Sequence, residues 1–372
     1  MKILYVTDAG LPTPRAHGIQ IAKVCESLGR TAELELFVPD RKNSITEDFF
    51  SYYDIDRTFK IKLVPCADFL SWTGVLGFFF HIFSFYWEAR KISKFTDFDC
   101  VYSRDLVAPI FFTDVVIEVH NLPRISTWFH RRVFARAKSF VAKTTFVKEE
   151  LVKRFGVDES KITVIPNGID IDDFNCRESM EEVRNKLRLP IDKKTALYTG
   201  SLQSWKGVDV FLYAAEKIIN VLFVIVGGDD KSVEEKKRKF PSRNIIFFGQ
   251  RPHRDMPLFM RAADVLVLPN AAGTDVSEKY TSPLKLFEYM AAGKPIIASD
   301  LPSIREIVSD TDVFFFKPND VSSLEMAIKQ VFSDPQGSSR RAHNSYELAA
   351  SFSWSRYVRK IVDIMSKPCV EY

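Results

Sequence analysis

Short apolar runs alternate with amphipathic stretches along almost the whole chain, and this alternation restricts the possible folds more than any other feature. The amphipathic stretches include 18–28, 148–155 and 208–219. Alternating strands and helices indicate parallel sheets that are covered by helices on both faces. The runs that we predict to be strands are Ile3–Val6, Leu34–Val38, Lys62–Val64, Cys100–Tyr102, Val115–Val119, Ser139–Ala142, Ile162–Ile165, Thr195–Thr199, Leu222–Val226, Ile245–Phe248, Val265–Pro269, Pro295–Ala298 and Val313–Phe316.

These thirteen strands are too many for one such sheet, and 372 residues exceed what one hydrophobic core usually supports. The strands divide about evenly near residue 170, where Pro166-Asn167-Gly168 gives a turn signal. A new helix is expected near Ser179, with Glu182 completing a capping box. We therefore predict an α/β protein of two doubly wound Rossmann-like domains, 1–172 and 173–350, facing across a cleft. The terminal helix in 351–372 is expected to pack back on the first domain.

The composition excludes several classes of protein. The chain has 52 basic and 48 acidic residues, a net charge of +4, so nothing in its charge predicts a nucleic-acid partner. The N-terminus "MKILYVTDAG" lacks the features of a signal peptide. Five cysteines are scattered without a Cys-x-x-Cys pair, which predicts neither a disulfide framework nor a metal site and favours the reducing cytoplasm. They are Cys25, Cys66, Cys100, Cys176 and Cys369.

One segment complicates this picture. The nineteen residues 69–87, "FLSWTGVLGFFFHIFSFYW", approach the length of a membrane span. Gly74, Gly77 and His81 dilute its hydropathy, and no second such segment exists in this sequence. We therefore favour a buried or interface-lying helix over a transmembrane one.

A second segment of the same domain is basic. From 124 to 148 there are seven basic residues and no acid, interleaved with Trp128, Phe129 and Phe134. Such a segment can rest on anionic lipid, or it can be a solvated face over core aromatics. Together with 69–87, it favours peripheral association with an anionic membrane surface on the cytoplasmic side. The basic residues are Arg124, Arg131, Arg132, Arg136, Lys138, Lys143 and Lys148.

Ligands of open parallel sheets bind beyond the carboxyl ends of the strands. After the first strand, a loop with Gly10 leads to a helix expected to begin near Gly18, whose amino end would suit an anion. The loop fits neither Gly-x-Gly-x-x-Gly nor a Walker loop, which disfavours a nicotinamide dinucleotide. A plain strand-to-helix connection fits it equally well.

In "YTGSLQSWKG", residues 198–207, a strand ends at Thr199-Gly200 and a loop delivers Lys206 just before the next helix. An ammonium group at the end of a strand can neutralise a phosphate, although a surface lysine is the plain alternative. After the strand that ends near 248, the backbone of 249–252 could read a base edge. His253 could contact a ligand or simply belong to the turn.

The stretch 281–300, "TSPLKLFEYMAAGKPIIASD", predicts a helix with Ser282 as N-cap and Gly293 as its stop. The N–H groups of Leu284 and Lys285 would then face a pyrophosphate. Glu288 could accept two hydrogen bonds from the vicinal hydroxyls of a ribose. The alternative is a core acid that is paired with a buried base.

Together these segments resemble the retaining GT-B glycosyltransferases of family 4, also called glycosyl transferases group 1. The resemblance rests on Gly200-Ser201-Leu202 with Lys206-Gly207, on "VIPNGID", "GQRPHRDMPLFMRAADVLVLPN" and "FEYMAAGKPIIASD", and on "YSRDLVAPI" and "EVHN" in the first half. It implies transfer of a hexosyl unit from a nucleotide-diphosphate sugar to a glycan or lipid-linked acceptor, in cell-envelope or polysaccharide biosynthesis.

The resemblance also implies residue roles. Lys206 would hold the diphosphate, and His120 would face the transferred sugar, as the two catalytic residues. Glu288 would bind the ribose, and 282–285 the phosphates. The donor-binding residues expected on this basis are Gly18, Gly200, Ser201, Gln250, Arg251, Pro252, Tyr280, Ser282, Leu284, Lys285 and Glu288.

Two positions depart from the family pattern. Ser201 stands where the family usually has an arginine, for which Arg104 or Arg254 could substitute, and Tyr280 stands where it usually has an acid. These departures keep a non-catalytic nucleotide-sugar-binding protein open as an alternative. A nucleotide-sugar epimerase of the same fold is a second alternative. No Asp-x-Asp pair follows a suitable strand, so we expect no cofactor and no required metal.

Overall fold

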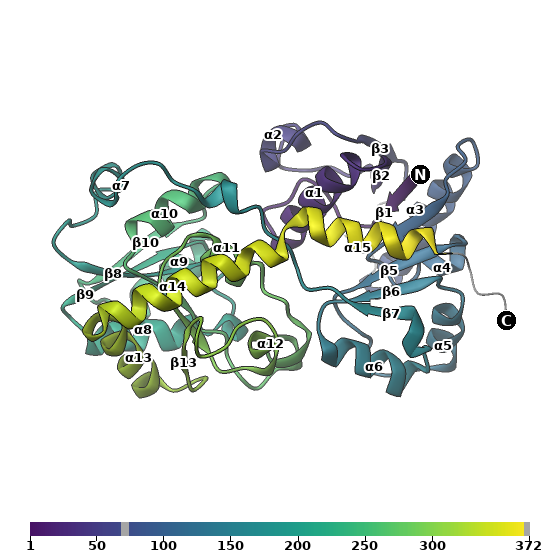
Figure 1. Ribbon diagram of the computed structural model, residues 1–372. Coiled ribbons are helices and arrows are strands. Elements are labelled where there is room, and N and C mark those ends of the chain that lie inside the picture. Colours follow the sequence, from purple (N-terminus) through teal and green to yellow (C-terminus); the bar gives the residue numbers. More distant parts are fainter. Residues whose placement is uncertain (68–73, 368–372) are drawn as a thin grey trace. The chain divides into compact units, whose positions relative to one another are not determined.

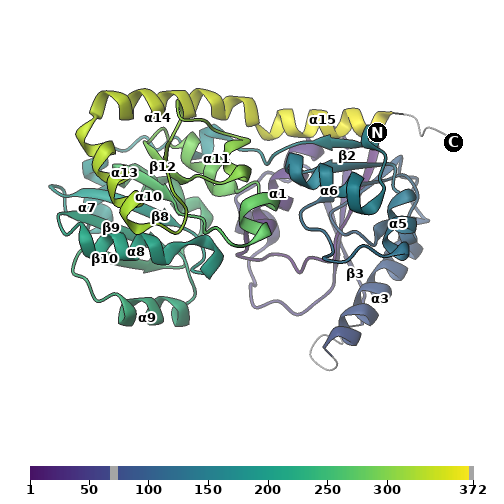
Figure 2. The same ribbon diagram turned by 90° about the horizontal axis from the view of Figure 1, so that it is seen from below.

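The computed structural model describes residues 1–67 and 74–367, and the chain divides into two compact units. Unit 1 comprises Met1–Pro166 with Trp354–Tyr372, and unit 2 comprises Asn167–Ser353. Each unit contains its own parallel sheet and its own core, and each is described by itself below (Figures 1 and 2).

Unit 1 is built on a seven-stranded parallel sheet in the order β3-β2-β1-β4-β5-β6-β7. Its strands are β1 Lys2–Val6, β2 Glu33–Pro39, β3 Lys60–Val64, β4 Cys100–Ser103, β5 Val115–Val119, β6 Ser139–Ala142 and β7 Ile162–Val164. Its helices are α1 Ala16–Gly29, α2 Phe49–Tyr53, α3 Val75–Ser93, α4 Ala108–Phe111, α5 Trp128–Ala135, α6 Thr145–Phe155, the 3₁₀ turn η1 Glu159–Lys161, and α15 Trp354–Ser366.

Unit 2 is built on a six-stranded parallel sheet in the order β10-β9-β8-β11-β12-β13. Its strands are β8 Lys194–Thr199, β9 Val221–Val226, β10 Ile245–Gly249, β11 Val265–Leu268, β12 Ile296–Ser299 and β13 Phe314–Phe316. Its helices are α7 Met180–Leu187, α8 Val208–Lys217, α9 Asp230–Lys239, α10 Met256–Ala262, α11 Leu284–Ala291, α12 Pro302–Arg305, α13 Val321–Ser333 and α14 Pro335–Ala349. Short turns are η2 Ile171–Phe174, η3 Ser204–Lys206, η4 His253–Asp255, η5 Val276–Tyr280 and η6 Ala350–Phe352.

All thirteen predicted strands are present, and most of the predicted runs are apolar segments of the kind that parallel sheets bury on both faces. The edge strand β3, with the sequence KIKLV, is an exception and is mostly exposed. β9, with the sequence VLFVIV, is buried at every position. In each unit the strand order reverses beside the first strand, between β1 and β4 and between β8 and β11. Such switch points open a crevice at the carboxyl ends of the strands, where ligands bind.

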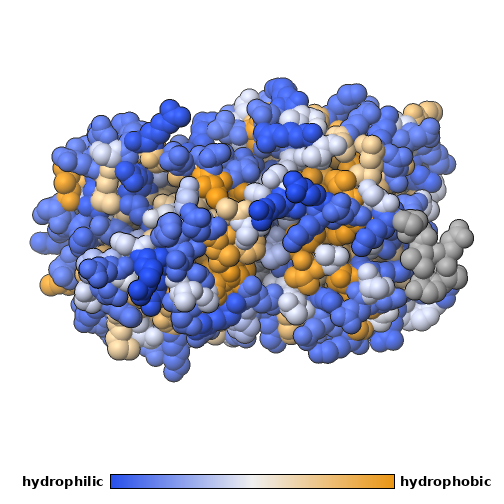
Figure 3. All heavy atoms as spheres, viewed as in Figure 1, coloured by the Kyte–Doolittle hydropathy of each residue, from blue (hydrophilic) through white to orange (hydrophobic). Residues whose placement is uncertain are grey.

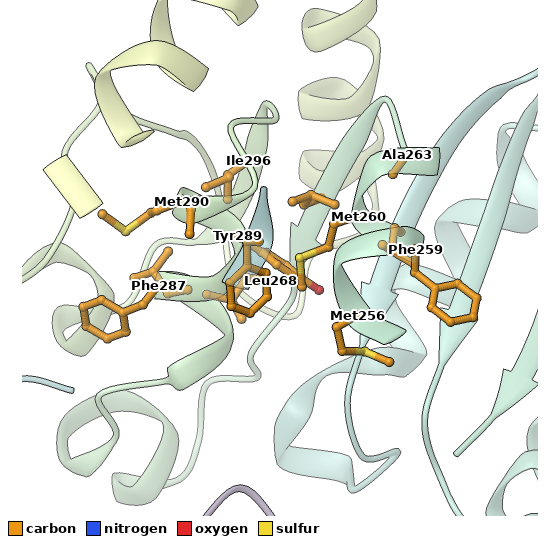
Figure 4. Packing of buried hydrophobic residues seen from close by; sticks show 14 of the residues in the cluster. Met256, Phe259, Met260, Ala263, Leu268, Phe287, Tyr289, Met290 and Ile296 are labelled. Carbon is orange, nitrogen blue, oxygen red and sulfur yellow. The ribbon is translucent and has the colours of Figure 1, made fainter. Parts of the chain in front are cut away.

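The core of unit 2 fixes α10 and α11 against the sheet (Figure 4). Phe287 and Met290 of α11 are fully buried, as are Met260 of α10 and Leu268 of β11. Burial of each such side chain stabilises the fold by about 1.5–3 kcal/mol. The helix that carries Glu288 is therefore held firmly on the sheet.

The beginnings of two helices differ from the prediction. α1 starts at Ala16, two residues before Gly18. α11 starts at Leu284 with Pro283 as its N-cap, so the prediction that Ser282 caps it was wrong. Ser282 is occupied elsewhere, because its Oγ accepts the N–H of Asn167 at 3.0 Å and its carbonyl accepts Asn167 Nδ2 at 2.6 Å. The predicted capping box of Ser179 and Glu182 on α7 is confirmed.

The apolar segment 69–87 falls largely in α3, with 69–73 outside the described residues. The helix buries His81, Phe85 and Tyr86 on one side and exposes more than half of Phe83 and Trp87 on the other. No helix in the described part of the chain combines the length and the hydropathy that crossing a bilayer requires.

Gly207 provides a test of the backbone packing at the end of β8. Its φ is +68°, and a Cβ there would lie 1.7 Å from the carbonyl oxygen of Pro269. Gly249, in the same unit, has a φ of +65° and open space where a Cβ would lie. We expect Gly249→Ala to cost about 1–2 kcal/mol through backbone strain alone, and Gly207→Ala to cost at least about 2 kcal/mol more. Urea unfolding of both variants measures the difference, and equal losses would contradict the close approach.

Candidate functional site

The carboxyl ends of β8 and β11 are tied together by backbone contacts. The N–H of Ala271, beyond β11, donates to the carbonyl of Trp205, in the turn after β8, at 3.0 Å. Gly207 lies directly against Pro269. At the same edge, the N–H of Thr199 donates to the hydroxyl of Tyr289 on α11 at 2.9 Å. The η3 turn and α11 are therefore both anchored at the switch point of the unit 2 sheet.

Lys206 ends the η3 turn at this edge. Its Nζ lies 3.8 Å from the centroid of the Trp205 ring. Burial lowers the pKa of Lys206 to about 8, an effect that Glu288 partly opposes. The side chain is thus a cation at neutral pH that has lost much of its hydration, which strengthens its attraction for an anion.

Lys285, in the first turn of α11, supplies a second ammonium group. Its Nζ is buried and has no hydrogen-bond partner among the described residues, and it lies 3.8 Å from the centroid of the Tyr198 ring. Burial lowers the pKa of Lys285 well below its usual range, and Lys206 lowers it further, whereas Glu288 raises it. The two lysines and Glu288 therefore share one electrostatic environment.

Glu288 is paired. Its Oε1 lies 2.9 Å from Nε2 of His253, in the η4 turn, and only 9% of the residue is exposed. The ring of His253 packs edge-on against Phe174 at 6.0 Å. His253 thus belongs to the turn, as one of the two interpretations holds, and its ring also orients the carboxylate of Glu288. A contact of His253 with a ligand stays a prediction.

Asn270 is a residue that the sequence reasoning missed. It follows β11 at the switch point, is 1% exposed, and neither Oδ1 nor Nδ2 has a hydrogen-bond partner among the described residues. The hydroxyl of Ser299, at the end of the neighbouring β12, is unpartnered in the same sense. Buried polar atoms are rarely left unsatisfied, so these atoms mark space that a ligand or water fills. Their positions directly after buried strands were the available signal.

The other predicted donor residues lie around this edge. Gly200 follows β8 with a φ of +125°, and Ser201 is exposed while its carbonyl accepts the hydroxyl of Tyr198 at 2.6 Å. Gln250, Arg251 and Pro252 are exposed after β10. Tyr280 ends η5 and Ser282 is buried before α11. Leu284 is the first residue of α11.

In unit 1, His120 follows β5 and its Nε2 lies 2.5 Å from Oε1 of Glu118. Burial lowers the pKa of His120 to about 4, with Arg104 adding to the effect and Glu118 opposing it. The imidazole is therefore neutral at neutral pH. A neutral ring can donate from one nitrogen and accept at the other, which suits sugar hydroxyls.

Glu118 is fully buried and lies at the centre of a polar cluster. It accepts hydrogen bonds from Gln20 of α1 at 2.7 Å and from Tyr102 of β4, and Lys143 lies 2.8 Å away. Burial alone would raise the pKa of Glu118, but Lys143 and His120 hold it well below its usual range. Lys143 also donates to the hydroxyl of Tyr357 on α15 at 2.6 Å, which ties the C-terminal helix to the sheet.

Two further predicted residues belong to unit 1. Gly18 lies in the first turn of α1, where a Cβ would meet the hydroxyl of Tyr53 at 2.1 Å, so local packing alone requires glycine there. Arg104 is held by the carbonyl of His17 and by Gln20, at 3.4 and 3.2 Å. No three His, Cys, Asp or Glu side chains gather as metal ligands in the described part of the chain.

Two family models match the chain. The one described as Glycosyl transferases group 1 matches residues 179–348, and the one described as Glycosyltransferase Family 4 matches residues 30–173. The chain belongs to these glycosyltransferases.

Curated relatives of this glycosyltransferase are distant. An uncharacterized glycosyltransferase of Methanocaldococcus jannaschii is 25% identical over 264 residues, which are 68% of this chain and 64% of the relative. D-inositol 3-phosphate glycosyltransferase of Mycolicibacterium smegmatis is 26% identical over 251 residues, 65% and 56% of the two chains. The matches thus span between about half and two thirds of the relatives' length.

Solved structures share the fold of this glycosyltransferase over nearly the whole chain. Sucrose-phosphate synthase of Thermosynechococcus elongatus superposes with a TM-score of 0.78 at 16% identity, covering 98% of both chains. HepE of Anabaena, in complex with UDP, superposes with a TM-score of 0.77 at 17% identity, covering 98% and 100%. The predicted fold class, two Rossmann-like units of GT-B type, is confirmed.

Removing the charge at the centre of the unit 1 cluster should destabilise this glycosyltransferase. Glu118→Gln leaves the Lys143 ammonium, 1% exposed, without its counter-charge. Breaking a buried pair in this way costs about 3–5 kcal/mol. The free energy of unfolding in urea measures it. The matched control is Glu149→Gln, which breaks an exposed pair with Lys153 in the same unit and should change stability little. Equal stability of the two variants would contradict the role of Glu118.

Proposed function

We propose that this glycosyltransferase moves a hexosyl unit from a nucleotide-diphosphate sugar to a glycan or lipid-linked acceptor, with retention of anomeric configuration, in cell-envelope or polysaccharide assembly. The observation that carries the proposal is the shared environment of Lys206, Lys285 and Glu288 at the switch point of unit 2. The structure of HepE in complex with UDP-glucose, which has the same fold, is consistent with such a donor.

The chemistry of the step explains the need for cations. The bond between the anomeric carbon and the diphosphate oxygen breaks, and its electron pair stays on that oxygen. The acceptor hydroxyl oxygen forms a new bond to the anomeric carbon, and its proton passes to the leaving diphosphate. Negative charge thus grows on the diphosphate, and fixed cations and N–H groups aimed at it are the largest expected source of rate acceleration.

The remaining groups take the other parts of the donor. Glu288, oriented by His253, accepts hydrogen bonds from the ribose hydroxyls. The unpartnered amide of Asn270 adds a donor and an acceptor group at the same switch point. His120, neutral and positioned by Glu118, faces the transferred sugar. Lys206 and the amino end of α11 supply positive charge, so the reaction proceeds without a divalent metal.

A different class of function has one observation in its favour. Ser201 and Tyr280 lack the charges that the family usually places there, as a non-catalytic nucleotide-sugar-binding protein could. Slow hydrolysis of a nucleotide sugar in the absence of acceptor separates the enzyme from such a binder.

Lys206→Ala provides the direct test. The donor is first chosen from UDP-, GDP-, CDP-, ADP- and dTDP-hexoses by the largest rise in melting temperature. We expect Lys206→Ala to lower the turnover or hydrolysis of that donor on the order of a hundredfold or more. Lys217→Ala, at the exposed end of α8, should leave it unchanged. Near-native turnover of a folded Lys206→Ala variant, or activity that EDTA abolishes and magnesium restores, would contradict the mechanism.

We also propose that unit 1 rests on an anionic membrane surface. α3, α4 and α5 are neighbours on one flank of unit 1 (Figures 1 and 2). Phe83 and Trp87 of α3, and Trp128 and Phe129 of α5, are each more than half exposed. The face drawn in Figure 3 is mostly hydrophilic, with several hydrophobic patches.

Only part of the basic segment 124–148 is available for contact with an anionic membrane surface. Arg131 and Arg132 are exposed, and the guanidinium of Arg132 lies 4.7 Å from the ring centroid of Trp128. Lys143 and Phe134, by contrast, are buried and belong to the core, so the prediction that they face lipid was wrong. Each exposed arginine near such a surface is worth about 1 kcal/mol.

Charge reversal tests the membrane contact. Arg131→Glu with Arg132→Glu should lower co-sedimentation with phosphatidylglycerol vesicles on the order of tenfold or more. Lys237→Glu with Arg238→Glu, on α9 of unit 2, is the matched reversal of two exposed cations and should have little effect. Binding that is insensitive to the α5 reversal would argue against the proposal.

A further inference from the structure

The ammonium group of Lys285 is the least satisfied charge at the unit 2 site. Its Nζ is buried without a hydrogen-bond partner among the described residues, although the residue as a whole is only half-buried. A buried charge is expensive unless it is paired. The ring of Tyr198 supplies a cation–π contact at 3.8 Å, but the hydroxyl of that ring donates to the carbonyl of Ser201.

The backbone beside Lys285 is shaped to admit this group. A Cβ at Gly200 would lie 3.0 Å from Nζ and 3.1 Å from Cε of Lys285. The φ of Gly200, +125°, is one that residues with side chains rarely adopt. Glycine therefore leaves room for the ammonium group next to the loop that begins with Gly200-Ser201.

The charges around Lys285 favour an anion of more than one negative charge. Lys206 is close enough to lower the pKa of Lys285, so the charge of Lys206 disfavours a second positive charge on Lys285 in the free protein. The carboxylate of Glu288 acts on both lysines but is itself paired with His253. An anion bound between the lysines would relieve their repulsion and satisfy the unpartnered Nζ.

We propose that Lys285 Nζ is the second cation that neutralises the leaving diphosphate, in the role for which Ser201 lacks a charged side chain. The inference rests on the proposed function and names a catalytic residue for it, distinct from the N–H groups of the α11 amino end. When the anomeric carbon–oxygen bond breaks and its electron pair remains on the diphosphate, Lys206 and Lys285 contact the oxygens on which the charge collects. Neither Arg104 nor Arg254 is then required.

Lys285→Met removes the charge and keeps most of the side-chain volume. We expect the ligand-free variant to be as stable as the native protein or more stable, because a buried amino group without a hydrogen-bond partner is replaced by an apolar side chain. Its affinity for the best-binding nucleoside diphosphate among ADP, GDP, CDP, UDP and dTDP should fall about tenfold or more. The affinity for the parent nucleoside should not change, and the turnover of the hexosyl donor should fall on the order of a hundredfold.

A matched control and a rescue sharpen the test. Lys294→Met removes another lysine of unit 2 whose pKa burial lowers to about 8, but its Nζ donates to the carbonyl of Arg261 at 3.2 Å. This variant should keep diphosphate affinity. Adding Ser201→Arg to Lys285→Met should restore part of the diphosphate affinity, because it returns a cation to the same loop.

The outcomes separate the two proposals. If the native protein binds none of the five nucleoside diphosphates, the proposed function fails. If it binds one and Lys285→Met binds it equally well with unchanged turnover, only the role of Lys285 is overturned. A Lys285→Met variant that is less stable without ligand and loses the nucleoside together with the diphosphate would show a structural lysine and overturn the inference as well.

Discussion

Burying a charged group costs free energy, and this cost constrains both units of this protein. Unit 1 offsets it with partners from the chain itself, whereas unit 2 leaves partners to be supplied by a ligand. In unit 1 the carboxylate of Glu118 is surrounded by Lys143, His120, Gln20 and Tyr102, so both of its oxygens have partners from the chain itself. In unit 2 the ammonium groups of Lys206 and Lys285 are desolvated without a full set of partners. Satisfied buried networks rigidify a fold, whereas unsatisfied ones are retained where a ligand completes them.

The Glu118 cluster of unit 1 and the lysine site of unit 2 therefore have different roles in the proposed activity. The Glu118 cluster joins α1, β4, β5, β6 and α15, and in doing so it fixes the position and the neutral state of His120. The unit 2 site is held by main-chain N–H groups instead: that of Ala271 donates to the carbonyl of Trp205, and that of Thr199 donates to the hydroxyl of Tyr289. Because main-chain groups hold the elements in place, polar side chains at that edge are not needed for hydrogen bonds within the fold. Both amide atoms of Asn270 have no partner among the described residues.

The sequence predicted what local patterns determine and missed what tertiary partners determine. Every strand was found, because continuous apolar runs between turn signals are a property of the chain itself. The start of α11 was misplaced by one residue, because Ser282 bonds to Asn167, more than a hundred residues away in the chain. Lys143 was assigned to a basic surface for the same reason, since its partner Glu118 lies on another strand. The cluster around Glu118 and the placement of Asn270 at the switch point needed the strand order, which no local pattern contains.

The loop before α11 explains why the charge of Lys285 remains available. Two acids lie between 271 and 280, and either would cancel that charge if it turned toward the ammonium group. Glu278 instead accepts the N–H of Gly273 at 2.6 Å, and Asp275 pairs with Lys279 at 2.9 Å. Tyr280 stands at the position where the resemblance leads one to expect an acid. None of these residues supplies a counter-charge, so no carboxylate of this loop opposes the positive potential at the amino end of α11. An anionic ligand therefore has to neutralise that potential.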